Sequence, residues 1–178
     1  MSSKKLFSIL IPSWNNLNFL KLCVESIKKN SSFQHQIIVH VNEGKDGSLE
    51  WIKSQEIEFT FSDENIGICK ALNLSAELVK TDYILYMNDD MYVLPNWDLE
   101  LKKEIDILKH NKFYLSATLL EPIDKGNPSV ISPAQYGSDI KSFQEEKLLK
   151  EYLNFDFKDW SGASWPPSLV HKDLWKAV

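Results

Sequence analysis

Strand-like and helix-like segments alternate along the first half of the chain, and this alternation limits the fold more than any other feature. Short runs of β-branched and other apolar residues, typical of buried strands, are separated by stretches whose apolar residues recur at helical spacing. The expected strands cover residues 6–11, 36–41, 57–61 and 83–87, and the expected helices cover 17–29, 49–54 and 66–79. This order predicts an α/β fold with a mostly parallel central sheet and helices on both faces.

The pattern becomes less regular after Pro95. We expect helices at 97–108 and 138–152, a strand at 113–120, a short strand at 129–132 and the start of a last helix at 168–178. The length of 178 residues is enough for one domain with a sizeable core, so we predict a single domain over residues 1–178.

Composition and charge exclude several classes of protein. The formal net charge of -5 argues against a general nucleic-acid binder, which needs a basic surface, but it leaves room for a bound cation. Cys23 and Cys69 both lie in amphipathic patterns, so we expect both to be buried, without a disulfide or a zinc site. No apolar run reaches the length of a membrane span, and we expect a soluble, cytoplasmic protein.

A cluster of polar residues follows each of the four strands in the first half. Because the carboxyl ends of parallel strands meet at one edge of a sheet, these loops are expected to lie close together there. The loops are residues 13–16, 42–47, 62–65 and 88–90. The last one contains Asn88, Asp89 and Asp90, and two adjacent carboxylates suit a hard cation that also binds phosphates. A solvated turn explains the same three residues equally well.

Four segments in order resemble family 2 of the nucleotide-sugar-dependent glycosyltransferases, which have the GT-A fold. The first is a strand that ends in Pro12, Ser13, an aromatic residue and Asn15. The others are residues 38–48, 65–73 and 83–90, which resemble the second strand with its acidic turn, the Asn-x-Gly segment and the strand with the Asp-x-Asp motif.

The resemblance implies roles for individual residues. It places Asp90 at the last acid of the Asp-x-Asp motif, as the ligand of a Mn²⁺ or Mg²⁺ ion, while Asn88 stands where the family usually has the first Asp. The implied donor-binding residues are Pro12, Ser13, Asn15, Glu43, Asn65, Gly67, Lys70, Asn88 and Asp89.

The resemblance also implies an activity. We expect a metal-dependent, inverting transfer of a sugar from a nucleotide-diphosphate donor, preferably a UDP-sugar, to a glycan or lipid-linked acceptor in cell-surface polysaccharide synthesis. Residues 1–97 would bind the donor, and residues 98–178 would begin the acceptor side. Peripheral association with the inner face of the membrane is left open.

The general base of the reaction is not found in the sequence. By resemblance it follows the equivalent of residues 174–176, and no acid in residues 150–178 matches it, so we expect a chain without the C-terminal acceptor and base segment. A nucleotide-sugar-binding module without transfer therefore stays open as an alternative. A sugar nucleotidyltransferase is disfavoured, because residues 12–16 hold neither the glycine nor the basic residue expected of a triphosphate loop.

Several residues near the C-terminus have two readings. Trp160, Trp165 and Trp175 either stack on sugar rings or pack in the core, and packing is the commoner role for such residues. His171 is better explained as the start of a helix than as a metal ligand.

Overall fold

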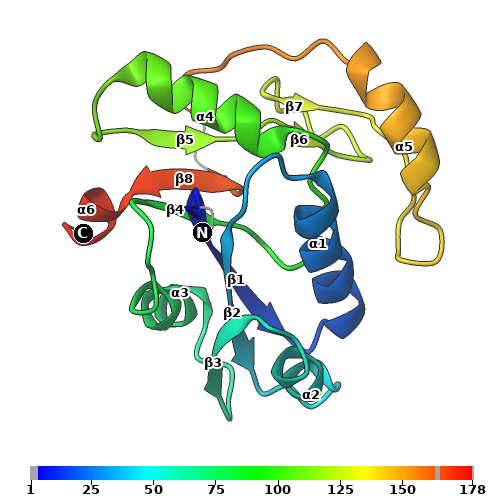
Figure 1. The fold of residues 1–178 in the computed structure, drawn as a ribbon. Helices are drawn as coiled ribbons and strands as arrows, with labels where there is room; N and C mark the ends of the chain where they lie inside the picture. Colours follow the sequence, from blue (N-terminus) through cyan, green and yellow to red (C-terminus); the bar gives the residue numbers. More distant parts are fainter. Residues whose placement is uncertain (1–3, 163–164, 178) are drawn as a thin grey trace.

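The computed structural model describes residues 4–162 and 165–177, and it has the predicted α/β architecture (Figure 1). One sheet of six strands has the order β3-β2-β1-β4-β8-β5. The strands are β1 (Phe7–Trp14), β2 (Gln36–Asn42), β3 (Glu58–Ser62), β4 (Tyr83–Tyr86), β5 (Tyr114–Ser116) and β8 (Ser168–His171). The first four run parallel to one another, whereas β8 is antiparallel to both of its neighbours, β4 and β5.

Helices cover both faces of this sheet because successive strand residues point to opposite faces. The helices are α1 (Leu17–Asn30), α2 (Ser48–Lys53), α3 (Ile68–Ala76), α4 (Trp97–Leu108), α5 (Glu145–Glu151) and α6 (Lys172–Trp175). In β1, Ile9 and Ile11 belong to the larger core cluster with residues of α1, α2 and α4, whereas Leu10 belongs to a smaller one with residues of α3 and α6. Figure 1 shows α1 and α2 on the opposite side of the sheet from α3.

A smaller unit lies beside the main sheet. The short strands β6 (Leu119–Leu120) and β7 (Val130–Ile131) form a parallel pair, and α5 is followed by the 3₁₀ helix η1 (Tyr152–Asn154). A third apolar cluster around Ala134, Tyr136 and Leu148 holds this unit together.

The prediction of a helix from residue 168 is wrong for its first turn. Residues Ser168–His171 form β8, which is buried along its whole length between β4 and β5. The helix α6 begins only at Lys172, where the side chain of His171 accepts a hydrogen bond from the backbone N–H of Asp173. His171 is thus at a helix start, as predicted, and a four-residue apolar run did not distinguish a strand from a helix.

Three further predictions need correction. The expected strand at 113–120 is two short strands, β5 and β6, and the expected helix at 138–152 is helical only from Glu145. The Asp139 carboxylate accepts hydrogen bonds from the backbone N–H groups of Lys141 and Ser142, at 2.9 Å each, and this local turn replaces the helix there. Cys23 is buried as expected, but Cys69 is exposed in the first turn of α3.

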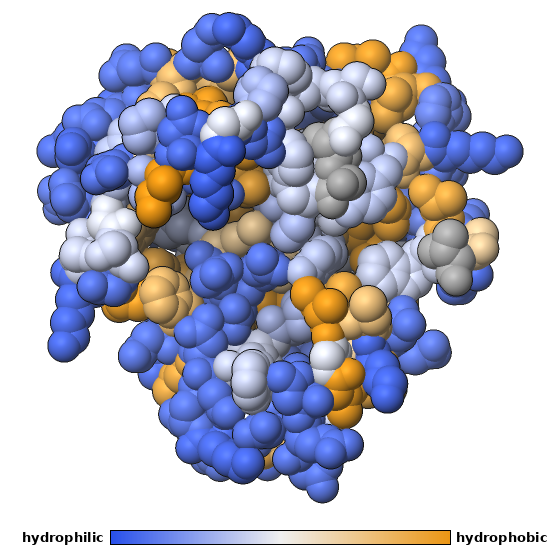
Figure 2. Space-filling view, turned by 180° about the vertical axis from the view of Figure 1, so that it is seen from behind, coloured by the Kyte–Doolittle hydropathy of each residue, from blue (hydrophilic) through white to orange (hydrophobic). Residues whose placement is uncertain are grey.

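The distribution of hydrophilic and hydrophobic side chains on the surface is typical of a globular protein. In the view from behind, hydrophilic side chains cover most of the visible face and hydrophobic ones occur in separate small patches (Figure 2). Within the described residues, we found no helix that combines the length and the apolar character needed to cross a bilayer.

Candidate functional site

The polar loops that follow β1, β2, β3 and β4 meet at one edge of the sheet. Trp14 pairs with Asn42, and Asn42 pairs with Ser62, so the ends of the first three strands lie side by side. Strand β4 ends earlier, where the backbone N–H of Met87 donates to the carbonyl of Leu10 at 3.0 Å. The loop after β4 therefore runs beside the last residues of β1, and the convergence expected from the strand order is present.

The side chains of Asn88 and Asp89 are both held by neighbours. The Asp89 carboxylate accepts a hydrogen bond from the Asn16 side-chain amide at 3.1 Å. The Asn88 side-chain oxygen accepts one from the Tyr86 hydroxyl at 2.5 Å. Burial raises the pKa of Asp89 above its ordinary value, although the Asn16 amide acts in the opposite direction. Asp90 is exposed next to it.

Pro12 and Ser13 are among the last residues of strand β1, before the loop begins. Ser13 is buried, and its hydroxyl is enclosed beside Asp89, where it acts to lower the pKa of that carboxyl. The hydroxyl oxygen is not in normal hydrogen-bond geometry with any residue that the structure describes. Because this hydroxyl is enclosed beside Asp89, it acts on that carboxyl from within the edge of the sheet.

Glu43 is engaged by its own surroundings. Its carboxylate pairs with the Lys45 ammonium at 2.9 Å and accepts a hydrogen bond from the Asn15 amide at 3.3 Å. Both Asn15 and Glu43 have positive φ angles, of 48° and 61°, which fixes the shape of the two loops. The hydrogen bond from Lys45 holds the pKa of Glu43 below its usual range. Both contacts are made to the same carboxylate oxygen of Glu43, Oε2.

Asn65, Gly67 and Lys70 lie at the start of α3. The Asn65 side-chain oxygen accepts a hydrogen bond from the Gly67 backbone N–H at 2.9 Å, and Gly67 has a φ of 77°, which favours glycine. Lys70 is exposed on α3 and has no ion pair within the residues that the structure describes. Its ammonium is therefore free to approach an anionic ligand.

Sequence reasoning missed the residues that hold these loops together. Asn42 is buried; its side-chain oxygen accepts from the backbone N–H of Ile66 at 3.0 Å and from the Ser62 hydroxyl at 3.2 Å. Its amide donates to the carbonyl of Ser13 at 3.4 Å. One side chain thus connects the ends of β1, β2 and β3.

Asp46 is a second such residue. It accepts hydrogen bonds from the backbone N–H groups of Leu17 at 2.6 Å and of Ser48 at 3.1 Å, so it joins the loop after β2 to the start of α1. Burial alone would raise the pKa of Asp46, but its hydrogen bonds with Ser48 and Leu17 outweigh burial and lower it. The Asp-Gly-Ser sequence is a turn signal that could have pointed to this role.

The donor set at this edge fits a cation that is shared with a ligand. Within residues 4–162 and 165–177 no three side chains of His, Cys, Asp or Glu come together in a way that would enclose a metal ion. One oxygen of Asp89 accepts a hydrogen bond from Asn16, whereas the carboxylate of Asp90 is exposed and would be the more open of the two to a cation. Mg²⁺ commonly uses one or two carboxylates and takes its other ligands from phosphate and water.

The fold is shared with solved structures of known proteins. The fold is similar to crystal structures of S. aureus TarS residues 1–349, with a TM-score of 0.67 at 14% identity, over 97% of this chain and 48% of that one. The same protein in complex with UDP and with UDP-GlcNAc gives TM-scores of 0.64 and 0.63. This likeness concerns the fold alone.

Sequence comparison identifies the family. Residues 8–171 match the model of glycosyl transferase family 2, and the chain belongs to this family. A curated relative, an uncharacterized glycosyltransferase of Rickettsia bellii (strain RML369-C), is 26% identical over 124 residues, which are 66% of this chain and 17% of the relative. The chain spans about half or less of the length of the proteins that it matches.

Proposed function

We propose that this chain binds the donor substrate of an inverting, metal-dependent glycosyltransferase, and that the donor is a UDP-sugar. The observation that carries the proposal is the pair Asp89 and Asp90 at the edge of the sheet, with Asp89 oriented by Asn16 and the Ser13 hydroxyl enclosed beside it. The UDP and UDP-GlcNAc complexes of TarS, a protein of the same fold, support the choice of donor.

Each residue at the edge would have a part in holding the donor. Asp90, with Asp89 beside it, would hold a Mn²⁺ or Mg²⁺ ion, which when bound supplies positive charge to the diphosphate leaving group. Asn88, whose side-chain oxygen accepts a hydrogen bond from Tyr86, would donate its amide hydrogens to a ribose hydroxyl. Lys70 would add a positive charge near the phosphates, and Glu43 would bind the edge of the nucleobase.

The acceptor in this proposal is a glycan or a lipid-linked sugar, and the reaction contributes to a cell-surface polysaccharide. Since nucleotide sugars are made inside the cell, we place the reaction in the cytoplasm or at the inner face of the membrane. We assign the general base to no residue of this chain.

Calorimetric titration with UDP, with and without Mn²⁺, tests the proposal. We expect binding that depends on Mn²⁺ in the unaltered chain and is lost in Asp90→Ala. The matched control is Glu104→Ala, which removes an exposed carboxylate from α4, a helix that contributes no side chain to the site. Unchanged binding of UDP and Mn²⁺ to Asp90→Ala would refute the metal assignment.

A second assay separates the enzyme from a binding module. Incubation with UDP-GlcNAc and Mn²⁺ is expected to release UDP, by hydrolysis or by transfer to an added acceptor. Binding of UDP without any turnover would favour the nucleotide-sugar-binding module instead.

A further inference from the structure

A cleft lies between the β6–β7 pair and the segment that follows η1. It has a volume of about 240 Å³ and is lined by Thr118, Pro128, residues 129–132, Asp156, Lys158 and Trp160. We propose that this cleft is an oligosaccharide-binding subsite and that it holds the sugar acceptor. The acceptor role rests on the function proposed above, whereas the binding of a sugar does not.

The cleft lies on the same edge of the sheet as the donor site. Ser116 at the end of β5 pairs with Ser168, and Ser168 pairs with Tyr86 at the end of β4. The ends of β4 and β5 are two strand spacings apart, which is roughly 10 Å. Thr118 follows two residues later, so the cleft begins within about 17 Å of the end of β4.

Unpaired hydroxyl groups line the cleft. The side chains of Thr118, Ser129 and Ser132 have no hydrogen-bond partner within the described parts of the chain. Asp156 and Lys158 pair with each other at 2.9 Å, but both side chains are largely exposed. Such an exposed pair contributes little to stability, so either partner can turn to a ligand at small cost. These groups together match the alternating donors and acceptors of a sugar.

Trp160 supplies an apolar surface at the same place. The residue is 48% exposed, and its side chain makes no aromatic or hydrogen-bonding contact within the described residues. A single exposed Trp is common, but here it lines a cleft with free hydroxyls. An indole ring buries a large area when the C–H face of a sugar packs on it, while hydroxyls bind the sugar's rim. The packing role expected for Trp160 is thus not met.

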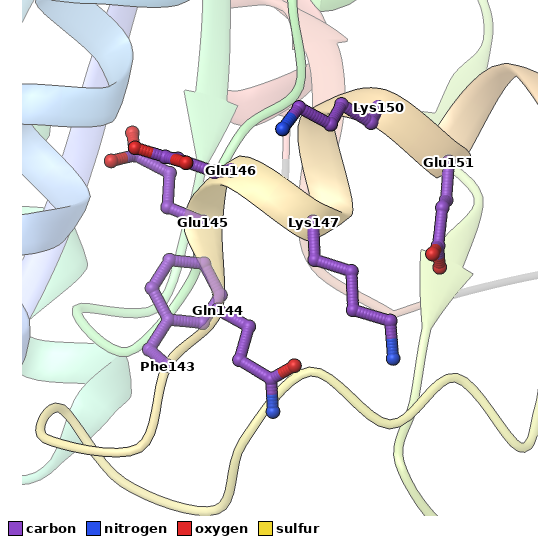
Figure 3. A pocket seen from close by; sticks show the side chains of 7 residues that line it. All are labelled: Phe143, Gln144, Glu145, Glu146, Lys147, Lys150 and Glu151. Carbon is purple, nitrogen blue, oxygen red and sulfur yellow. The ribbon is translucent and has the colours of Figure 1, made fainter.

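Another hollow of the surface, beside α5, offers no such combination. It is larger, about 550 Å³, but its lining comes only from Phe143, Gln144 and the charged side chains of α5. These side chains point in different directions (Figure 3). Glu145 is already bonded to Lys29 and to Tyr92, at 2.7 Å each. This hollow therefore lacks a convergent set of groups.

The test is saturation-transfer NMR on the full 178-residue chain with three trisaccharides: chitotriose, cellotriose and maltotriose. We expect a saturation-transfer signal from at least one of these sugars. That signal should fall at least fivefold in Trp160→Ala and be largely restored in Trp160→Phe. Phe157→Ala is the matched control, because Phe157 is 47% exposed in the same segment but does not line the cleft. Asp156→Asn is a second variant that keeps the Trp, and it is expected to weaken binding as well.

A parallel titration with UDP and Mn²⁺ separates this inference from the proposed function. Trp160→Ala is expected to bind UDP like the unaltered chain. The subsite is refuted if no saturation-transfer signal appears with any of the three sugars, even if UDP binds. It is equally refuted if neither Trp160→Ala nor Asp156→Asn changes that signal. If the sugar binds in a way that depends on Trp160 but UDP does not bind, the subsite is supported and the donor proposal is refuted.

Discussion

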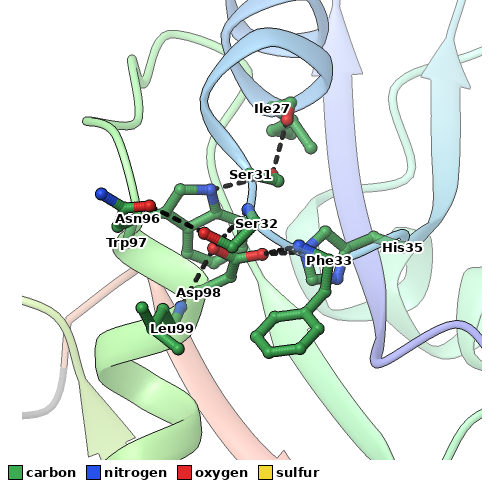
Figure 4. A network of polar contacts seen from close by, with 9 residues as sticks. All are labelled: Ile27, Ser31, Ser32, Phe33, His35, Asn96, Trp97, Asp98 and Leu99. Carbon is green, nitrogen blue, oxygen red and sulfur yellow. Dashed lines mark hydrogen bonds and ion pairs between the residues drawn. The ribbon is translucent and has the colours of Figure 1, made fainter.

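Replacing Asp98 by Asn is expected to destabilise the whole protein. Asp98 lies near the start of α4 with no exposed surface, and its carboxylate accepts hydrogen bonds from the backbone N–H groups of Ser32 at 2.9 Å and Phe33 at 2.8 Å. It also pairs with Nε2 of His35 at 2.9 Å. All three donors belong to the segment between α1 and β2, so one side chain connects this segment to α4 (Figure 4).

The expected loss follows from these contacts. Asparagine has one acceptor oxygen, and its amide would face N–H donors that are buried. Each hydrogen bond to a charged group is worth about 1.5–3 kcal/mol, and a buried donor left without its partner costs about 1–3 kcal/mol. Since these two terms overlap for the three donors, we expect a loss of about 3–5 kcal/mol of the free energy of unfolding. For a domain of this size that lowers Tm by roughly 6–20 °C.

Urea denaturation at several pH values measures this loss. Burial acts to raise the pKa of Asp98, but the hydrogen bonds from His35, Ser32 and Phe33 outweigh it and hold the pKa below its ordinary value. The stabilisation from ionised Asp98 is therefore complete above the unfolded pKa of about 4 and is lost as the pH falls through the lower folded pKa. The difference from Asp98→Asn should shrink over that range.

The control is Asp106→Asn in the same helix, where the carboxylate is exposed and a change below about 0.5 kcal/mol is expected. A loss for Asp98→Asn of less than about 1 kcal/mol at pH 7, or a difference that does not vary with pH, would refute this account of the network.

Three other substitutions test the site and its loops. Gly44→Ala should destabilise the protein by about 1–3 kcal/mol, because a non-glycine residue with positive φ is strained and an added Cβ would lie 2.8 Å from Cβ of Leu49. The control is Gly126→Ala, which also has a positive φ but lies in open space. Equal decreases of Tm in the two variants would contradict the role of crowding. Asn16→Leu leaves Asp89 without its amide donor and should weaken binding of UDP with Mn²⁺ about tenfold with the fold retained, since about 1.4 kcal/mol is tenfold in affinity; wild-type affinity in calorimetry would show that Asn16 does not orient Asp89. Tyr86→Phe removes the hydroxyl that holds Asn88 and should weaken the same binding about fivefold, for a hydrogen bond of about 1 kcal/mol; the prediction fails if the calorimetric Kd is unchanged.

The sequence predicts an element most accurately where a helical pattern of apolar residues extends over many positions. Residues 17–29 and 97–108 were predicted as helices, and α1 and α4 have these bounds to within one residue. Residues 168–171 were misassigned because the direction and the partners of a four-residue strand depend on β4 and β5, which are more than 50 positions away in sequence. No local pattern contains that information.

The same distinction applies to the candidate site. Sequence order alone located the four loops, since parallel strands end at one edge. The contacts between the loops were not predictable, because Asn42 reaches Ile66 and Asn16 reaches Asp89 across 24 and 73 positions. The donor-binding and metal-binding roles given to individual residues stay predictions until they are measured, as does the division at residue 97.

The antiparallel strand β8 determines how the edge with Asp89 and Asp90 is related to the cleft with Trp160. Because β8 runs opposite to both β4 and β5, β5 regains the direction of β4, and both strands end at the same edge. The antiparallel strand β8 thus separates β4 from β5 by one strand, while the carboxyl ends of β4 and β5 stay at the same edge of the sheet. The segment after β4 carries the carboxylates, and the segment after β5 leads into the cleft with Trp160. A transferase needs its two substrates side by side and in line, and this strand order brings two polar sites to one edge with one strand between them.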